Sequence, residues 1–184
     1  AGLRDRRDGR VVLAMEMFER DVQPTLDAYL RGEIDEPAFL AKARPWSNYR
    51  TAYRPMIELA KASGAPVVAS NFPSTLRRKL GTDGIDALSP EERALAPAEL
   101  LANTPAYWRR VDNAVRGHAA MMGPAPAADD PRLNSVQSLW DNSMGEACAL
   151  ALRNHRGSSV LHVNGGFHSE YWDGTARQFQ LREP

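Results

Sequence analysis

The chain has 184 residues, a mass of 20.3 kDa, 43% hydrophobic and 25% charged residues, as expected of one globular domain that needs no metal or disulfide to fold. Its 23 basic residues balance 23 acidic ones, which argues against a nucleic-acid binder because such proteins carry excess positive charge. No apolar run reaches the roughly 20 residues of a membrane span, and the single cysteine, Cys148, excludes an internal disulfide and any CxxC motif.

Three short apolar runs predict β-strands at residues 11–15, 66–70 and 159–163. Each run is apolar at nearly every position, which is typical of strands buried on both faces of a parallel sheet. A fourth run, at 178–181, alternates between polar and apolar residues and predicts an edge strand.

Helix signals fill the intervals between these strands. Capping residues and prolines predict helices that begin near Asp21, Asp35, Arg54, Ser89, Thr104 and Ser135, the last of which runs to Arg153. The pattern predicts an α/β fold with a mainly parallel sheet flanked by helices, and a long helical insertion between the second and third visible strands. We expect a single domain over residues 1–184. Because three strands make a thin sheet and the chain starts at Ala1 without a signal-peptide pattern, we also expect a first strand to be missing.

Polar residues follow all three predicted strands. The first strand runs into Glu16, the second into Asn71, and the third into Asn164 and the Gly-Gly-Phe-His168 segment. The carboxyl ends of parallel strands share one edge of a sheet, where ligands bind, so these residues predict a site. Alternatively, each of them caps a loop or helix. Glu16 lies between two methionines, where a buried carboxylate needs a partner or a role, as a general base or as an anchor for an arginine.

An aromatic and basic block spans residues 46–54. It contains Tyr49 and Tyr53, each followed directly by an arginine, Arg50 and Arg54. A tyrosine phenolate can ligate ferric haem, and a neighbouring arginine favours the anion and can pair with a haem propionate. Spacing alone favours the alternative, in which both tyrosines pack in the core.

Gln137, Asp141, Met144 and Cys148 follow helical spacing and share one face of the predicted helix at 135–153. Polar residues along an apolar stripe predict a site. Alternatively, Gln137 and Asp141 lie at the wet margin of the stripe.

None of the four histidines belongs to an HxxxH, HExxH or CxxCH motif. His155 and His118 fit helix ends at the surface, and His162 lies inside a strand, where a buried, hydrogen-bonded histidine is expected. His168 follows two glycines at a strand end and is the best site candidate.

These residues resemble a known family. The blocks Glu16-Met17-Phe18, FLAKARPWSNYRTAYRP, VVASNFP, QSLWDNSM and NGGFHS are similar, in order, to the ChaN-like, iron-regulated haem-binding proteins of bacteria. The similarity covers about residues 11–177. The W-x-x-Y-x-x-x-Y-R-P and N-G-x-F-H blocks are its specific parts.

The resemblance implies an α/β fold distantly related to erythromycin-esterase-like proteins, and haem b as the cofactor. It implies that Tyr49 or Tyr53 ligates iron with support from His168, while Arg50 or Arg54 meets the propionates. The remaining residues of the implied haem site are Asn71, Asn164, Gln137, Asp141 and Met144. The family's first strand, which ends in a Gly-Glu-x-His motif, has no counterpart here, so part of the site is expected to be missing.

The resemblance also implies a function in bacterial haem or iron uptake and a periplasmic or outer-membrane-associated protein, often lipid-anchored. No anchor site is present in this chain, since Cys148 lies inside a predicted helix. Because a second copy would shield a five-coordinate haem, we also consider a homodimer.

Two alternatives stay open. One is a hydrolase akin to the esterase-like relatives, in which Glu16 and His168 act on an activated water, since no G-x-S-x-G motif supplies a serine. The other is a scaffold whose site was lost with the missing strand. The sequence does not decide whether the protein is an enzyme.

Overall fold

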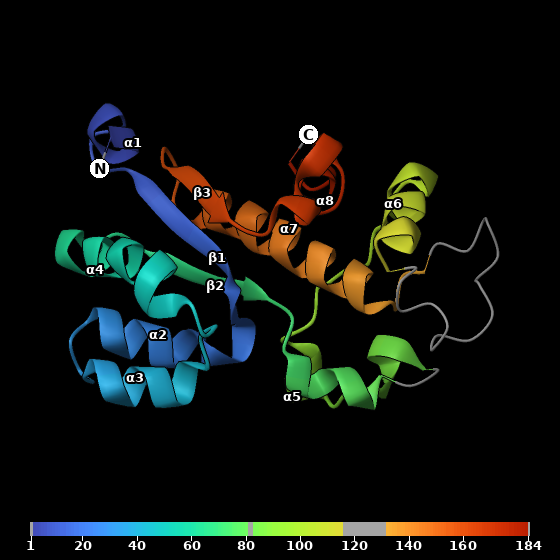
Figure 1. The fold of residues 1–184 in the computed structure, drawn as a ribbon, viewed down its shortest axis with the longest axis horizontal. Coiled ribbons are helices and arrows are strands. Elements are labelled where there is room, and N and C mark those ends of the chain that lie inside the picture. The colour runs from blue at the N-terminus through green and yellow to red at the C-terminus, as the bar shows by residue number, and fades with distance from the viewer. Residues whose placement is uncertain (1, 81–82, 116–131, 184) are drawn as a thin grey trace.

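The computed structural model describes residues 2–80, 83–115 and 132–183 (Figure 1). His118, considered above, and the Pro-rich segment at 123–131 lie outside the described residues. The α/β fold predicted from the sequence is confirmed: a parallel sheet is flanked by helices, and a long run of helical segments lies between its second and third strands.

The sheet has three strands, β1 (Val11–Glu19), β2 (Val67–Asn71) and β3 (Ser159–Val163), in the order β2-β1-β3. Both pairings are parallel, with Leu13 of β1 opposite Val67 of β2 and Leu161 of β3. The strand β1 continues four residues beyond its predicted end, so Glu16 lies inside the strand.

The helices have the following bounds in the described residues. They are α1 (Gly2–Arg6), α2 (Gln23–Leu30), α3 (Glu36–Ala43), α4 (Arg54–Ser63), α5 (Pro90–Arg93), α6 (Pro105–Val115), α7 (Val136–Asn154) and α8 (Thr175–Gln180). Short 3-10 turns are η1 (Arg20–Val22), η3 (Ser74–Lys79), η4 (Gly84–Ala87), η6 (Gly166–His168) and η7 (Glu170–Trp172), and η2 (Tyr49–Tyr53) is a π-helix.

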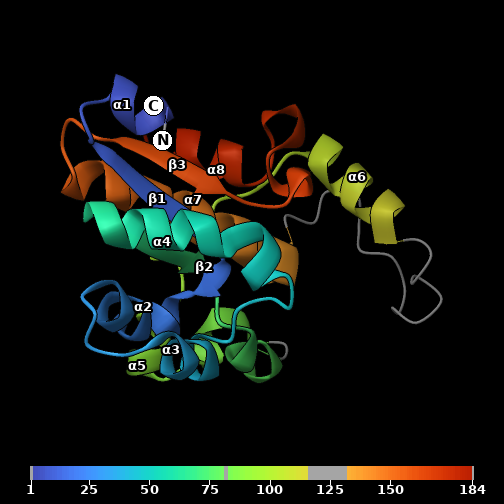
Figure 2. The same cartoon turned by 60° about the vertical axis from the view of Figure 1, so that its left-hand side comes forward.

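Two layers of helices cover the sheet. Helix α4 and helix α7 lie on opposite faces of it, as Figure 2 shows, and α7 contacts all three strands. The side chains of β1 alternate between these layers as far as Met17, after which Phe18 packs in the same core as Met17. Leu13, Met15 and Met17 enter the hydrophobic core under α2, α3 and α4, so Glu16 points to the α7 side.

Local signals explain most of the helix boundaries. Asp35 caps α3 by accepting a hydrogen bond from the backbone N–H of Ala38, and Ser89 forms a complete capping box with Glu92. Helix α4 ends at Gly64, whose φ of 63° is left-handed. The helix expected from Asp21 begins as the turn η1 and becomes α-helical only at Gln23.

The predicted edge strand at 178–181 is wrong, because this segment belongs to helix α8 and the turn that follows it. Gln178 is fully buried, and its amide donates to the Leu101 carbonyl and to Asn103. Helix α8 packs closely on α7, where Gly145 leaves room for Gln178. Four alternating residues were too short a signal to distinguish a strand from an amphipathic helix.

Candidate functional site

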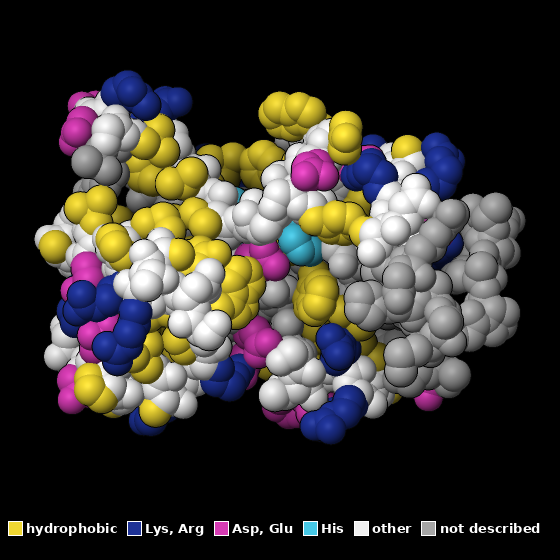
Figure 3. Space-filling view, viewed as in Figure 1, with side chains coloured by type: hydrophobic (Ala, Val, Ile, Leu, Met, Phe, Trp, Pro, Cys, Tyr) yellow, Lys and Arg dark blue, Asp and Glu magenta, His cyan; other side chains and the backbone are white. Residues whose placement is uncertain are grey.

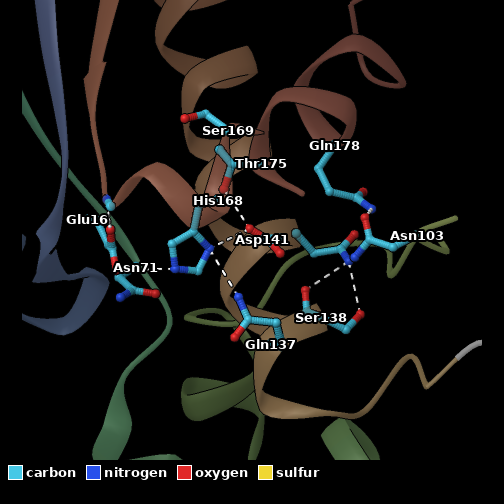
Figure 4. A network of polar contacts seen from close by, with 12 residues as sticks. Glu16, Asn71, Asn103, Gln137, Ser138, Asp141, His168, Ser169, Thr175 and Gln178 are labelled. Carbon is cyan, nitrogen blue, oxygen red and sulfur yellow. Dashed lines mark hydrogen bonds and ion pairs between the residues drawn. The ribbon is translucent and has the colours of Figure 1, made fainter. Parts of the chain in front are cut away.

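His168 lies at the carboxyl end of the sheet, in the turn η6 that follows β3. It is 7% exposed. Its Nδ1 atom lies 2.7 Å from Oδ1 of Asp141, and its Nε2 atom lies 3.4 Å from Oε1 of Glu16 (Figure 4). The imidazole is therefore held between a carboxylate from α7 and one from β1. The turn η6, helix α7 and strand β1 are far apart in the sequence.

Asp141 is the centre of the buried hydrogen bonds around this histidine. Its side chain is fully buried and accepts hydrogen bonds from the Thr175 hydroxyl at 2.9 Å and from the Tyr107 hydroxyl. The Gln137 amide lies 3.2 Å from Nδ1 of His168. The predicted polar face of α7 thus points into the site, and Asp141 does not lie at a wet margin.

Charge complementarity holds the Glu16–His168–Asp141 cluster together. Burial alone would lower the pKa of His168, but its hydrogen bonds to Asp141 and Glu16 raise it to about 9. Burial opposes the charge on Glu16 too, but contact with His168 and the Gly165 N–H, which donates to Oε2 at 2.6 Å, keeps its pKa below the usual value. At neutral pH the cluster contains an imidazolium between carboxylates.

His162 differs from His168 in its protonation. It lies 3.0 Å from the Ser70 hydroxyl through Nε2, and desolvation lowers its pKa to about 4, so it is neutral at pH 7. The expected hydrogen-bonded strand histidine is therefore present, although it is only half-buried. His155 caps the end of α7, as expected.

A pocket of about 280 Å³ opens beside His162, between β3, α7 and α8. It also contacts Asn164, Ser169, Thr175 and Cys148. The Asn164 side-chain nitrogen is buried and has no partner among the described residues. This volume lies just below the usual range for pockets that hold drug-sized ligands.

The remaining predicted strand-end and helix residues occupy two kinds of position. Asn71 ends β2 and lies beside Glu16 in Figure 4, where its side chain accepts a hydrogen bond from the Phe72 N–H. Met144 is fully buried in α7, so it contributes packing.

The two predicted tyrosines lie in different environments. Tyr49 is 2% exposed, packs against Phe39 with ring centroids 5.9 Å apart, and its hydroxyl has no partner in the described part of the chain. Burial raises the pKa of Tyr49 to about 12. Tyr53 is half-buried and meets Trp46 edge-on at 5.7 Å. Both tyrosines belong to the π-helix η2, but Tyr49 is buried in the core whereas Tyr53 packs against its edge.

The arginines of this block also differ. Arg54 forms a salt bridge with Glu36 at 2.6 Å, whereas Arg50 is exposed and takes part in none of the salt bridges within the described residues. The block lies near the end of β1, since Arg44 bonds to both Glu19 and Asp21.

The structure therefore divides the predicted residues into two groups. The histidine group comprises Glu16, Asn71, Gln137, Asp141, Asn164 and His168. The tyrosine group comprises Tyr49, Arg50, Tyr53 and Arg54. Within the described ranges, no hydrogen bond or salt bridge joins the two. In Figure 3 a histidine is visible at the centre of the face, with acidic side chains beside it and apolar side chains on either side.

Several side chains that contact the histidine group could not be found from the sequence. Tyr107 and Thr175 each bond to Asp141 across 34 residues, and no local pattern marks such a contact. Trp140 and Phe167 pack edge-on against His168, with centroids 6.4 and 6.0 Å away. In the sequence, only their positions directly before Asp141 and His168 pointed to them.

Comparison with known proteins decides the family. A family model described as "Haem-binding uptake, Tiki superfamily, ChaN" matches residues 1–179. The chain belongs to this family. The resemblance inferred from the sequence blocks is thereby confirmed.

A solved structure and a curated protein are also similar to this ChaN-family chain. The structure, described as cofacial heme binding to ChaN of Campylobacter jejuni, superposes with a TM-score of 0.59 at 14% identity, over 97% of this chain and 66% of that one. It supports the fold. "Protein RETICULATA-RELATED 5, chloroplastic" of Arabidopsis thaliana is 28% identical over 89 residues, 48% of this chain and 12% of that protein. The chain thus spans less than two thirds of both.

Two further findings concern metals and membranes. In the described ranges, no group of three or more His, Cys, Asp or Glu side chains is placed to hold a metal ion. No helix in that part of the chain has the length and hydropathy to cross a membrane.

Proposed function

We propose that this ChaN-family chain binds haem b at the carboxyl edge of its sheet and serves haem or iron uptake. The observation that carries the proposal is that both family-like blocks lie near the carboxyl end of β1. The block with Tyr53 follows Arg44, which forms a salt bridge with Glu19 at the end of β1. The block with His168 follows β3 and contacts Glu16 of β1. Haem binding is also what the family description names.

Tyr53 is the better iron ligand of the two tyrosines. The Tyr49 oxygen lies in a core between helices, so a haem iron reaches it only if α3 and α4 separate. Tyr53 lies at the edge of this core, beside the half-exposed Trp46. The exposed Arg50 is free to meet a propionate, while Arg54 would first have to leave Glu36.

His168 supports the bound haem through charge and hydrogen bonding. Both of its nitrogens contact carboxylates, and a protonated imidazole has no lone pair for iron. Such a cation favours an anionic ligand, either a phenolate or a propionate. Asp141 and Gln137 orient the ring, and Asn71 and Asn164 complete the polar edge. This role keeps the histidine within the haem site without direct coordination.

A haem titration followed by absorption spectroscopy tests the proposal. Wild type is expected to give a saturable Soret shift, Tyr53→Phe to lose the tyrosinate spectrum, and Tyr49→Phe to keep it. The two variants are matched, since each removes one hydroxyl from the same π-helix. Absence of any Soret shift in wild type would contradict the proposed function. An unchanged spectrum in Tyr53→Phe would contradict the choice of ligand.

Export to the periplasm or outer membrane, a lipid anchor and a homodimer belong to the same proposal. Light scattering with and without haem tests the dimer, which is expected to form when haem is added. The hydrolase alternative gains no support, because Glu16, its general base, forms an ion pair with His168 and has a lowered pKa, which makes it a weak base.

A further inference from the structure

Two adjacent aromatic residues protrude from the turn η7. Tyr171 is 76% exposed and Trp172 is 74% exposed, more than any other large hydrophobic residue described. Isolated apolar residues are common on protein surfaces, but an adjacent Tyr–Trp pair with this exposure is the kind of surface that binds a partner or ligand.

The backbone of this pair is strained. Tyr171 and Trp172 both have φ of 57°, in the left-handed region that bulky side chains rarely adopt. Glycine occupies such positions at far less cost. Two unfavourable features, strained backbone and exposed aromatic surface, therefore coincide in one dipeptide. Strain of this kind concentrates at binding sites.

The neighbouring residues hold the pair in place. The Arg110 guanidinium of α6 lies 4.9 Å from the centre of the Tyr171 ring. The same guanidinium forms a salt bridge of 2.8 Å with Asp173, the residue after the pair. Asp173 also accepts a hydrogen bond from the Thr104 hydroxyl. The loop is thus anchored to α6 and to the residue that precedes it.

We propose that Tyr171 and Trp172 stack against the porphyrin plane of the haem bound at the His168 edge. This inference rests on the proposed function and adds a contact surface to it. The two residues follow His168 by three and four positions, so an extended chain places them at most about 11 and 14 Å away. Flat aromatic rings gain both buried apolar area and ring contact from a planar aromatic ligand. The anchored loop presents them without further ordering.

Haem titration of matched variants tests the stacking. The double variant Tyr171→Ala/Trp172→Ala is expected to raise the haem Kd about tenfold or more, since both ring contacts are lost. The double variant Tyr171→Phe/Trp172→Phe keeps two rings and is expected to bind within about twofold of wild type. The control is Leu59→Ala, which removes an exposed apolar side chain of α4. Circular dichroism and thermal melting of each variant show that the fold is kept.

A second readout places the haem near Trp172. Haem quenches nearby tryptophan emission, so Trp172→Phe is expected to remove a large share of the emission that haem quenches in wild type. Equal haem affinity of the double alanine variant and wild type would overturn the inference. Loss of affinity in the phenylalanine variant would also overturn it, because both rings are kept there and the effect would then belong to the phenol hydroxyl or the indole. Failure of wild type itself to bind haem would instead contradict the proposed function.

Discussion

Nδ1 of His168 lies 2.7 Å from a carboxylate oxygen of Asp141, a side chain with no exposed surface. This contact joins α7 to the turn after β3, and it places a cation in a region from which water is excluded. A buried ion pair of this kind costs desolvation energy on both sides, so its partners must be kept in place by further hydrogen bonds. Tyr107 and Thr175 supply these to Asp141.

The first prediction concerns the pH dependence of stability. The folded-state pKa of His168 is about 9, above its value of 6.5 in an unfolded chain. The proton therefore stabilises the native state fully below pH 6.5, and this contribution is lost as the pH rises through 9. The loss amounts to about 3 kcal/mol in unfolding free energy. Urea denaturation of wild type and His168→Gln between pH 6 and pH 9.5 measures it. A difference between the two proteins that stays constant with pH would contradict the prediction.

The second prediction concerns the partner of this histidine. Asp141→Asn keeps the shape of the side chain but removes the charge that faces His168, and it places an amide group against three donors. We expect a loss of about 3 kcal/mol in unfolding free energy. Asp8→Asn is the control, because its salt bridge with Arg10 is largely exposed and is worth less than about 1 kcal/mol. Denaturant midpoints should separate the two variants clearly.

The third prediction concerns the hydroxyl of Tyr49, which has no hydrogen-bond partner among the described residues. A buried polar group without a hydrogen bond is unfavourable, and Tyr49→Phe removes it while leaving the ring. The variant is expected to be as stable as wild type or more stable by about 1 kcal/mol. Tyr107→Phe provides the contrast, because it removes a hydroxyl that bonds to Asp141, and its expected loss is about 1–3 kcal/mol. Similar losses in both variants would show that Tyr49 has a partner in solution.

The fourth prediction concerns the packing of α8 on α7. A methyl group at Gly145 would lie 2.5 Å from the Cβ atom of Gln178 and 2.8 Å from backbone atoms of α8. Because backbone atoms cannot move aside as a side chain can, Gly145→Ala is expected to destabilise the fold by about 1–3 kcal/mol. At Gly166 the nearest atom would be 3.5 Å away, so Gly166→Ala should change the melting temperature little. Equal melting temperatures for the two variants would be incompatible with this packing.

The fifth prediction tests whether the strained backbone of Tyr171 is kept for haem binding. Tyr171→Gly relieves a left-handed φ, so we expect a gain of about 1 kcal/mol in stability, or about 2–4 °C in Tm for a chain of this size. The same variant should bind haem more weakly than wild type. Greater stability together with weaker binding is characteristic of a residue kept for function. A variant that melts earlier than wild type would show that the ring stabilises the loop.

Much of the fold could be predicted because its signals are local. The capping box at Ser89, the N-cap at Asp35 and the left-handed Gly64 each fix a boundary within one turn of helix. The three apolar runs became the three strands, with shifts at their ends. The segment at 178–181 was wrong because four residues contain too little periodicity, and its burial against Gly145 of α7 decided its conformation.

The site could be predicted only in part. The strand ends named Glu16 and His168, and helical spacing named Asp141, but nothing in the sequence states that these three side chains touch. Their contacts span 27 and 152 positions, and contacts of that range depend on the whole packing. The same limit hid Tyr107 and Thr175. The tyrosine block was found from its composition, yet neither the π-helix that contains both tyrosines nor the deeper burial of Tyr49 leaves a mark in the sequence.

Strand β1 has a consequence for how the gene can change. Its odd-numbered residues, from Leu13 to Met17, fill the core under α2 to α4, and Glu16 between them reaches the imidazole. Deleting one codon between Val12 and Met15 would reverse the side chains from that point to Met17, so that a carboxylate would enter the core and a methionine would face the ion pair. A substitution in this strand changes the size or polarity of one side chain, whereas a change of length by one residue moves several side chains to the opposite face at once. We therefore expect related proteins to differ in the residues of this strand but to keep its length.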